Sequence, residues 1–438
     1  MARKPNATYP DSVQPGIPVL GPLPKGWVRE PLGKRLHEIK RPIKMRDDCT
    51  YNLVTVKRSR GGAVKRESLH GKEIKVKSQF EVHSGDFLIS KRQIVHGACA
   101  LVPEELHGAI VSNEYSILGS KKDLDLIFLR YLSETKYFQE TCFHSSIGVH
   151  VEKMVFKLDR WLKWEFNFPP IEEQKKIVKI LSLWEDAIHC TRETISNRKY
   201  TKKLLMRSLL TGKMRIPGFN KEWAKTRVKD IAEIYGGLTG KAKHDFEIEE
   251  GNFFIPYTNV YNNRITDEHC LGKVNIKKNE SQHKVCFGDI LFTMSSETQN
   301  EVGMSSVCLI NGVDIYLNSF CFGLRLKSLK AYSLHFISFL LRAEHVRSTI
   351  IKQGQGTIRY NLSARRLLEV VLQIPPLDEQ KAIAQVLTAA DALIAQYEAK
   401  LAHLQQQKKA LMQQLLTGKI RVTPDTPDTS GNACETPA

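Results

Sequence analysis

The sequence predicts an α/β (α+β) protein in which two globular domains are joined by two long helices that pair as an antiparallel coiled coil. Three observations lead to this prediction. A helical segment occurs twice, each copy carries its own start and stop signals, and short β-rich runs fill the regions that precede the copies. A segment repeated at a fixed offset, each time after a larger region, indicates a molecule with a pseudo-twofold internal repeat.

The helical segment occupies residues 169–216 and again 375–422, an offset of 206 positions. The copies open with similar runs, PPIEEQK and PPLDEQK, and both contain LLTGK near their ends. We count 18 identities over the 48 aligned positions, which is too many at one fixed offset for chance. The segment is therefore a duplication, and its two copies are expected to adopt the same structure.

Each copy predicts one long helix with defined ends. Two prolines fix the first turn, acidic side chains follow at the positive end of the helix dipole, and Gly212 or Gly418 stops the helix. Apolar side chains recur at alternating steps of four and three residues, which is typical of a coiled-coil seam. The seam of the first copy is Ile177, Leu181, Trp184, Ile188, Thr191, Ile195, Arg198, Lys202, Leu205 and Leu209, and the second seam lies 206 positions later.

The pseudo-twofold relation between the copies favours antiparallel pairing of the two helices. An alternative is that two unrelated amphipathic helices are buried in one core. That alternative does not account for the shared ends, the shared length, or the lysine found at one seam position of both copies, Lys202 and Lys408.

Weaker repetition extends into the regions before the helices. The run VHSGDFL at 82–88 matches VCFGDIL at 285–291, and KGW at 25–27 matches KEW at 221–223. The chain therefore divides into a flexible arm (1–22), a first domain (23–168), a first spacer helix (169–215), a second domain (216–374), a second spacer helix (375–422) and a disordered tail (423–438).

Both domains are predicted to mix strands with helices. Strands are expected at 52–56, 87–90, 253–256, 290–294 and 307–310. Helical runs are expected near 124–139 and 333–351.

The composition favours a polyanionic partner. The chain has 438 residues, a formal net charge of +18 and a pI near 9.4, and nucleic acid is the commonest partner of so basic a protein. No segment approaches the roughly 18 to 20 consecutive apolar residues that span a membrane, so a soluble intracellular protein is expected. Nine cysteines without a C-x-x-C pair favour reduced thiols over a disulfide framework or a zinc site.

The arrangement resembles the HsdS-type specificity (S) subunit of type I restriction-modification systems. The resemblance rests on two divergent domains, each followed by a helix that begins P-P-[IL]-x-E-Q and ends L-L-T-G-K, and it covers about residues 23–422. It implies that each domain is a target recognition domain that reads one half of a split site in double-stranded DNA. It further implies that the paired helices set the spacer between the half-sites and dock two methyltransferase (M) subunits. Endonuclease (R) subunits would complete the complex, in the cytoplasm of a bacterium or archaeon.

The resemblance also implies a chain that is non-catalytic on its own and binds no cofactor, with S-adenosylmethionine, ATP and Mg²⁺ on its partner subunits. The sequence agrees. Its P-P pairs lack the preceding acidic, Asn or Ser residue and the following aromatic residue that an amino-methyltransferase needs, and no G-x-x-x-x-G-K-[ST] run cradles ATP.

Two alternative functions stay open. One is a fused nuclease or methyltransferase subunit with an unrecognised active site, for which the acid-x-Lys runs at 38–40 and 73–75 are weak candidates. The other is a structural adaptor that joins proteins through the helices without reading DNA sequence.

The DNA-binding residues are predicted on polar loops beside strands, because Arg and Lys read guanine, Asn and Gln read adenine, and other basic groups hold phosphates. The first-domain candidates are Lys57, Arg58, Arg60, Ser90, Lys91, Arg92 and Gln93. The second-domain candidates are Asn259, Tyr261, Asn262, Arg264, Thr293, Ser295, Thr298, Gln299, Arg359 and Tyr360. The histidines show no metal-ligand spacing, so no metal site is predicted.

The starts of the two helices are the predicted partner-binding surfaces. Two identical M subunits need two similar surfaces, and 169–181 and 375–387 are among the most alike stretches of the chain. The contacts expected there are Glu173, Gln174, Glu379 and Gln380.

The heptad pattern yields a test of the helices as a ruler. One extra heptad adds roughly 10 Å of helix, or about three base pairs, and keeps the apolar seam on one face. Inserting one heptad near Thr191 and another near Tyr397 should lengthen the preferred spacer and leave both half-sites unchanged. Binding to duplexes that carry the same half-sites at a series of spacings measures this. If a folded variant keeps the original spacing, the helices only tether the domains.

Overall fold

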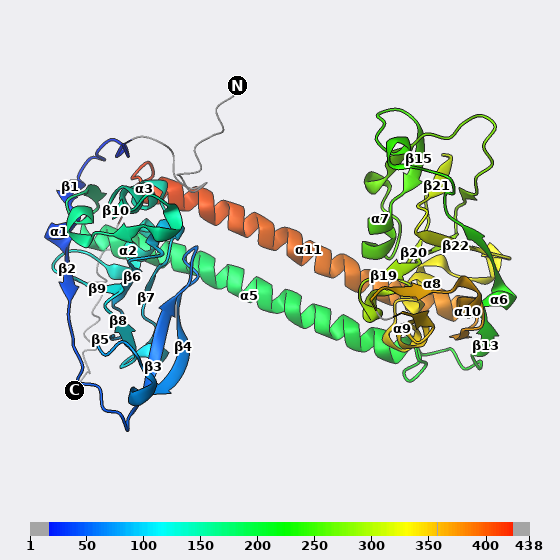
Figure 1. The fold of residues 1–438 in the computed structure, drawn as a ribbon, viewed down its shortest axis with the longest axis horizontal. Helices are drawn as coiled ribbons and strands as arrows, with labels where there is room; N and C mark the ends of the chain where they lie inside the picture. Colours follow the sequence, from blue (N-terminus) through cyan, green and yellow to red (C-terminus); the bar gives the residue numbers. More distant parts are fainter. Residues whose placement is uncertain (1–16, 357, 424–438) are drawn as a thin grey trace, which may run out of the picture. The chain divides into compact units, whose positions relative to one another are not determined.

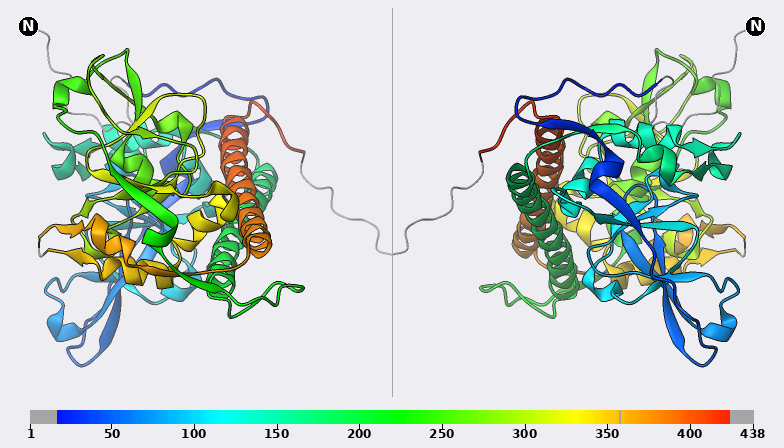
Figure 2. Two further views of the ribbon diagram at one scale, coloured as in Figure 1. Left: turned by 90° about the vertical axis from the view of Figure 1, so that its right-hand side faces the viewer. Right: turned by 90° about the vertical axis from the view of Figure 1, so that its left-hand side faces the viewer.

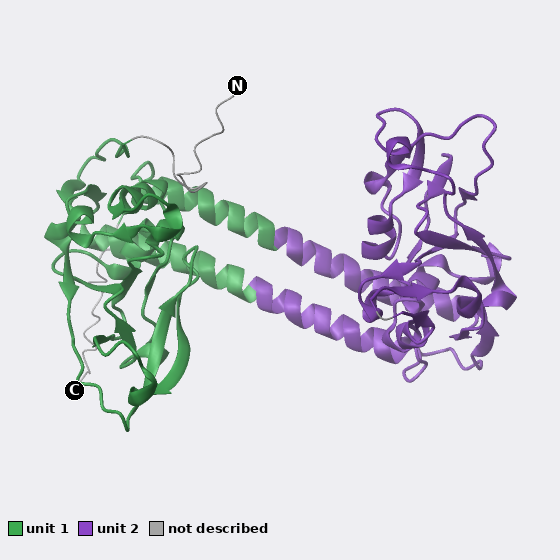
Figure 3. Ribbon diagram, in the orientation of Figure 1, with its two compact units in different colours: residues 1–190, 401–438 green, residues 191–400 purple. Residues whose placement is uncertain are grey.

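The fold is described from a computed structural model of the chain, over residues 17–356 and 358–423. It contains two compact units (Figure 3), of which unit 1 comprises residues 1–190 and 401–438 and unit 2 comprises 191–400. Residues 1–16 of the predicted arm and 424–438 of the predicted tail lie outside the described residues. The chain is thus not divided at the ends of the helices, because part of each helix packs into each unit.

The two long helices form as predicted (Figure 1). Helix α5 runs over Ile171–Leu209 and helix α11 over Leu377–Leu416. Gly212 and Gly418 follow their ends with φ of 68° and 67°, a left-handed conformation that glycine adopts at little cost. Within unit 2, Lys199 pairs with Glu398 and Lys202 with Asp391, so the helices run antiparallel there.

The predicted seam is largely confirmed. Ile177, Leu181 and Ile188 are buried on α5, and Ile383, Leu387 and Leu415 are buried on α11. Arg198 is an exception, because its side chain is exposed. The ends of the helices also enter the cores of the domains. Ile177, Leu181 and Leu415 belong to the core of unit 1, and Leu209, Ile383 and Leu387 to that of unit 2.

Unit 1 holds two four-stranded sheets and smaller ones. The strands are β1 (Val28–Pro31), β2 (Leu36–Ile39), β3 (Thr50–Val56), β4 (Ala63–His70), β5 (Gln79–Glu81), β6 (Phe87–Ser90), β7 (Cys99–Leu101), β8 (Ile110–Ser112), β9 (Tyr115–Ser120), β10 (Ser146–Ile147), β11 (Val155–Phe156) and β12 (Glu165–Phe168). The sheet orders are β2-β9-β6-β7 and β4-β3-β8-β5, with β3 parallel to β8. The long β3–β4 hairpin lies at the rim of this unit (Figure 2).

Unit 2 repeats this plan. Its strands are β13 (Ala224–Arg227), β14 (Ala232–Gly236), β15 (Asn252–Ile255), β16 (Gly272–Val274), β17 (Lys284–Val285), β18 (Ile290–Thr293), β19 (Ser295–Ser296), β20 (Ser305–Val307), β21 (Ile315–Leu317), β22 (Cys321–Leu326), β23 (Gly354–Gln355), β24 (Tyr360–Leu362) and β25 (Val371–Ile374). The orders β14-β22-β18-β20 and β16-β15-β21-β17 match the two sheets of unit 1, and β15 is parallel to β21. The whole half-molecule is therefore repeated, as the weaker sequence matches predicted.

The matched Gly-Asp turns show why the repeat survives divergence. Gly85 and Gly288 adopt φ of 84° and 88°, and the following carboxylates of Asp86 and Asp289 accept hydrogen bonds from the backbone of His83 and Cys286 at 2.8 Å each. Each turn thus satisfies its own backbone and delivers the next strand, β6 or β18, into the centre of its sheet.

Two details differ from the sequence prediction. The strand expected at 307–310 is β20, which ends at Val307, because its register is set by pairing with β18. The helical runs are hairpins of two helices each: α2 (Leu126–Leu132) with α3 (Lys136–His144), and α8 (Leu334–Leu340) with α9 (Glu344–Ile351). In the first hairpin, residues 133–135 separate the helices, and the side chain of Thr135 caps the start of α3.

The remaining helices are short and join strands. They are α1 (Leu32–Arg35), α4 (Leu158–Trp161), α6 (Val228–Ile231), α7 (Tyr257–Asn262) and α10 (Ala364–Leu368). No helix in the described part of the chain is long and apolar enough to cross a membrane.

A buried carboxylate clamps the start of each long helix to its unit. In unit 1, Glu173 accepts hydrogen bonds from Arg421 at 2.7 Å and from the indole of Trp27 at 3.2 Å. Glu379 of unit 2 accepts the same pair of groups, from Arg215 at 2.5 and 2.8 Å and from Trp223 at 3.2 Å. A buried carboxylate is costly without such partners. Because the arginine comes from the segment after the other long helix, each clamp ties the start of one long helix to that segment.

A second carboxylate joins the seam lysine to the globular domain of the same unit. Lys408 donates to Glu185 at 2.8 Å, and Arg130 of α2 binds the same carboxylate at 2.6 and 2.8 Å. In unit 2, Lys202 and Arg264 share Asp391, which occupies the equivalent position of α11. The seam lysines therefore act as ion-pair partners between the helices.

Glu185 gives a pH-dependent prediction. Burial raises the pKa of Glu185, but the hydrogen bonds from Arg130 and Lys408 outweigh burial and lower it to about 2. A lowered pKa means that this stabilisation is present above the unfolded value of 4.5 and is lost as the pH falls from there towards 2. Because the carboxylate is partly exposed, Glu185→Gln should destabilise unit 1 by only about 1 to 2 kcal/mol at pH 7.

Thermal denaturation of the wild-type protein and the variant at pH 7 and pH 3 measures this effect. The difference in melting temperature should shrink at pH 3. Glu193→Gln, at an exposed glutamate of the same helix, is the matched control and should change the melting temperature little at either pH. An equal difference at both values of pH would contradict the assignment.

Candidate nucleic-acid interface

Two predicted clusters form one surface in the first domain. The loop between β3 and β4 carries Lys57, Arg58 and Arg60, and the loop after β6 carries Lys91, Arg92 and Gln93. The guanidinium of Arg58 donates to the side chain of Gln93 at 2.8 Å, and a backbone hydrogen bond joins Ser59 to His96. The two loops are therefore held together, although they are far apart in sequence.

The second-domain candidates fall in three segments, 259–264, 293–299 and 359–360, and these segments are also neighbours. Strand β19 pairs with β24, which places Ser296 opposite Tyr360. The hydroxyl of Tyr257 on α7 donates to the backbone oxygen of Ser295 at 2.7 Å. A hydrogen bond to Glu301 raises the pKa of Tyr261, and thus links the α7 cluster to the loop that follows β19.

The two surfaces occupy the same place in the repeated fold. Each lies on the connection that follows the central strand, from β6 to β7 in unit 1 and from β18 to β20 in unit 2. Each connection contains a short 3-10 helix, η2 (Ile94–His96) or η7 (Gln299–Glu301). The match of the Gly-Asp turns predicted this equivalence.

The candidate residues differ in their access to solvent. Seven are exposed: Lys57, Arg58, Arg92, Asn262, Thr298, Gln299 and Arg359. Six are partly exposed: Arg60, Lys91, Gln93, Tyr261, Arg264 and Tyr360. Four are buried: Ser90, Asn259, Thr293 and Ser295.

Several candidates use their polar groups in contacts within the protein. Arg60 donates to the backbone oxygen of Ser133 at 2.7 Å and to Gln139 at 2.8 Å. Arg264 lies 3.7 Å from the centre of the Phe339 ring. Buried Asn259 donates to two backbone oxygens, at 2.9 Å each. A base contact by any of these three would require breaking internal contacts, so the exposed set is the better candidate for DNA.

The predicted partner contacts are buried. Glu173 is 2% exposed, Gln174 and Glu379 are 0% exposed, and Gln380 is 1% exposed. Beyond the carboxylate clamps, Gln174 bonds the backbone of Asp125, and Gln380 bonds that of Ser333 at 2.8 Å. These side chains hold each hairpin against the helix start and cannot meet a partner in this conformation. These four side chains therefore have an internal role in this structure, and their part in docking a partner stays a prediction.

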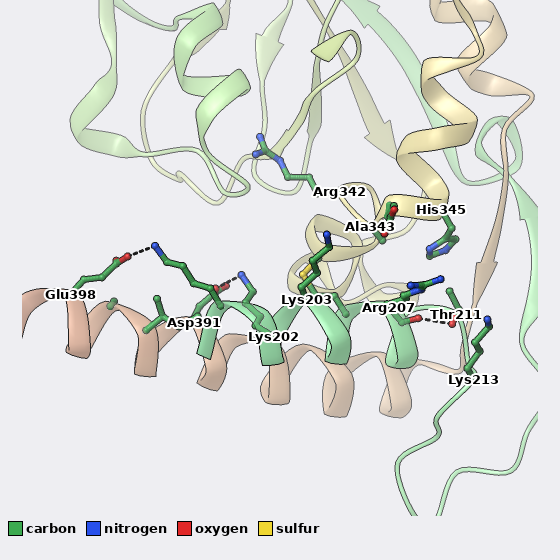
Figure 4. Close-up of a pocket in the computed structure, with 15 residues that line it drawn as sticks. Lys202, Lys203, Arg207, Thr211, Lys213, Arg342, Ala343, His345, Asp391 and Glu398 are labelled. Atoms are coloured by element: carbon green, nitrogen blue, oxygen red, sulfur yellow. Dashed lines mark hydrogen bonds and ion pairs between the residues drawn. The ribbon is translucent and has the colours of Figure 1, made fainter. Parts of the chain in front are cut away.

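Unit 2 also contains a groove of about 970 Å³ beside the second half of α5 (Figure 4). Its lining combines apolar side chains, among them Met206, Ala343 and Ile394, with basic ones, among them Lys203, Arg207 and Lys213. Arg342 also lines this groove, and Figure 4 shows its side chain extending towards the ribbon segments drawn above α5. No group of three or more potential metal-ligating side chains occurs within the described ranges.

Sequence reasoning missed the residues that support the loops. Arg342 lies at the turn between α8 and α9 and Arg347 on α9, and both donate only to backbone oxygens of the second-domain loops. Nothing in the local sequence distinguishes them from surface arginines. Tyr257, stacked on Tyr261 with ring centres 6.1 Å apart, carried a weak signal in its i, i+4 spacing on α7.

The fold and the sequence match known proteins. The type I restriction modification DNA specificity domain matches residues 36–198 and 220–406. The chain is 26% identical over 332 residues to the type I restriction enzyme MjaVIII specificity subunit of Methanocaldococcus jannaschii, covering 72% of this chain and 75% of that protein. It is 28% identical over 264 residues to the putative MjaX specificity subunit of the same organism, covering 58% of this chain and 59% of that one.

Solved structures share the fold. The HsdS subunit from Thermoanaerobacter tengcongensis matches with a TM-score of 0.55 at 17% identity, over 92% of this chain and all of that one (100%). A chain from a study of complex assembly and conformational transition of a type I R-M system matches with a TM-score of 0.62 at 17% identity, over 91% of this chain and 100% of that one. Because the family's specificity domain matches twice and spans most of the chain, this protein belongs to the specificity subunits of type I restriction-modification systems.

Proposed function

We propose that each recognition domain of this subunit reads one half of a bipartite site in double-stranded DNA, and that the paired helices set the spacer. One observation carries the proposal. The two units repeat one strand order, and each carries exposed candidates on the connection after the strand that follows the Gly-Asp turn, Arg92 in one unit and Thr298 and Gln299 in the other. Two similar surfaces with different side chains are suited to two different half-sites.

The chemistry of the exposed side chains indicates which of them suit bases and which suit phosphates. Gln299 and Asn262 carry amides that can bond adenine, and Arg359 can bond guanine. Lys57 is suited to phosphates, and the net charge of +18 supports the salt-dependent part of the affinity. Arg92 already pairs with Glu114 at 2.8 Å, so it can contact DNA only by exchanging that partner.

The methyltransferase subunits are proposed to dock on the exposed side of the two helix starts. Lys175 and Lys381 are equivalent, exposed positions there. A groove of about 380 Å³ beside Lys381 is lined by Ser333, His335, Ala384, Gln385 and Thr388. S-adenosylmethionine, ATP and Mg²⁺ are assigned to the methyltransferase and endonuclease partners, which would supply the chemistry.

The alternatives make different predictions for the purified chain. A structural adaptor would bind DNA without sequence preference. A fused enzyme would methylate or cut DNA when given S-adenosylmethionine or Mg²⁺ alone. Sequencing methylated adenines in the host genome is the most direct test, because one motif shows both half-sites and their spacing.

Domain exchange tests whether the two domains read their half-sites independently. Replacing residues 25–168 with the equivalent domain of a relative should change one half-site and preserve the other half-site and the spacer, because each reading surface lies within one unit. Methylome sequencing of cells that express the chimera reports the motif. A chimera that assembles normally but changes both half-sites, or neither, would show that the domains do not read independently.

Charge reversal tests the docking surface. Lys175→Glu and Lys381→Glu should each weaken binding of one methyltransferase subunit by about tenfold, as expected for a charged contact of about 1.4 kcal/mol. At a concentration between the wild-type and variant dissociation constants, mass photometry of the complex should then show mostly one bound methyltransferase subunit for each single variant and mostly none for the double variant. Lys225→Glu, at an exposed lysine of β13, is the matched control. Full occupancy in the double variant would exclude this surface.

A further inference from the structure

Two arginines of the α8–α9 hairpin bind the backbone of the second-domain loops. Arg347 is only 9% exposed, and it donates to the backbone oxygens of Val302 at 2.8 Å and Asn300 at 3.0 Å, and also to that of Gly303. These acceptors belong to the end of η7 and the turn after it. The guanidinium therefore fixes the course of the loop that carries Thr298 and Gln299.

Arg342 holds the neighbouring cluster in the same way. It donates to the backbone oxygens of Val260 at 2.9 Å, Tyr261 at 3.0 Å and Asn263 at 2.9 Å, and to that of Ser305 at 2.7 Å. One guanidinium thus joins the end of α7 to the start of β20.

The acceptors of both arginines are all carbonyl groups of the main chain. A bond to a carbonyl fixes the position of the backbone and leaves the loop's own side chains free to meet DNA. Burial lowers the pKa of Arg342 to about 10, so it stays charged at pH 7 and remains a strong donor. Removing such a donor leaves several buried carbonyl groups unpaired.

The first domain uses a different residue for the same purpose. Gln139 is the fourth residue of α3, as Arg347 is the fourth of α9. Gln139 is 3% exposed and donates to the backbone oxygens of Ile94 at 3.2 Å and Val95 at 2.7 Å, in η2. Its amide oxygen accepts from Arg60 at 2.8 Å, and this links the β3–β4 loop to the same anchor.

We propose that Gln139 in the first domain, and Arg347 with Arg342 in the second, are positioning residues that determine specificity by fixing the backbone of the reading loops. This inference rests on the proposed function, because it assumes that the loops read DNA. The hairpin is then the common support in both domains, and the loop side chains supply the sequence preference. Since base contacts depend on geometry, loss of an anchor should lower discrimination between correct and incorrect bases at one half-site.

The experiment measures discrimination, not affinity alone. Arg347→Met removes the hydrogen-bond donors and keeps a side chain of similar length. Arg347→Gln introduces glutamine, the residue type that anchors the loop in the first domain. Gln139→Met removes that first-domain anchor. Binding of each full-length variant, in complex with its methyltransferase subunits, is measured on the wild-type site and on sites with one changed base in either half. Arg365→Met, at an exposed arginine of α10, is the matched control.

The expected result is reciprocal. Arg347→Met should lower discrimination at one half-site about tenfold or more, which is the worth of a good base contact, and Gln139→Met should do so only at the other half-site. Arg347→Gln should keep part of the discrimination. A residue that only stabilises the domain would instead lower the melting temperature and weaken all sites equally.

The outcomes separate the two proposals. Wild-type discrimination in folded Arg347→Met and Gln139→Met variants would overturn the positioning role and leave the reading function intact. If Arg347→Met does not fold, Arg347→Gln and Gln139→Met carry the test, and unchanged discrimination in both overturns the proposal. A wild-type complex that shows no sequence preference at either half-site would instead overturn the reading function itself.

Discussion

A buried carboxylate at the start of each long helix organises the unit around it. Glu173 and Glu379 are almost inaccessible to solvent, and each is surrounded by an arginine from beyond the end of the other helix and an indole from the start of a recognition domain. A charge in such a place is tolerated only when these partners are present. The helix pair and the recognition domain are therefore fixed to each other at one point in each unit.

The same logic recurs along the helices and in the hairpins. Glu185 and Asp391 hold equivalent positions and pair with the equivalent seam lysines, yet their third partner differs, Arg130 in one unit and Arg264 in the other. The anchors of the reading loops also differ, glutamine in one unit and arginine in the other. The positions of these polar contacts are thus the same in both halves of the repeat, although the residues that make them differ between the two domains.

This arrangement separates support from recognition. The supporting side chains are buried and bond the backbone or one another, whereas exposed candidates such as Gln299 and Arg359 lie on the loops above them. Such loops can change most of their side chains without disturbing the core, because their anchors bond mainly the loop backbone; Arg60, which bonds Gln139, is the exception among the contacts described above.

The sequence by itself determined the repeat, the two helices, their ends and their seam, because local capping, a heptad spacing and a fixed offset are all visible along the chain. It also placed the loop after the Gly-Asp turn at the same position in both domains. Only the tertiary structure decided that Glu173, Gln174, Glu379 and Gln380 face inwards, and that Arg60, Asn259 and Arg264 serve the fold. Whether a polar side chain is exposed depends on residues distant in sequence, such as Trp27 and Arg421 around Glu173, and no local pattern records those partners.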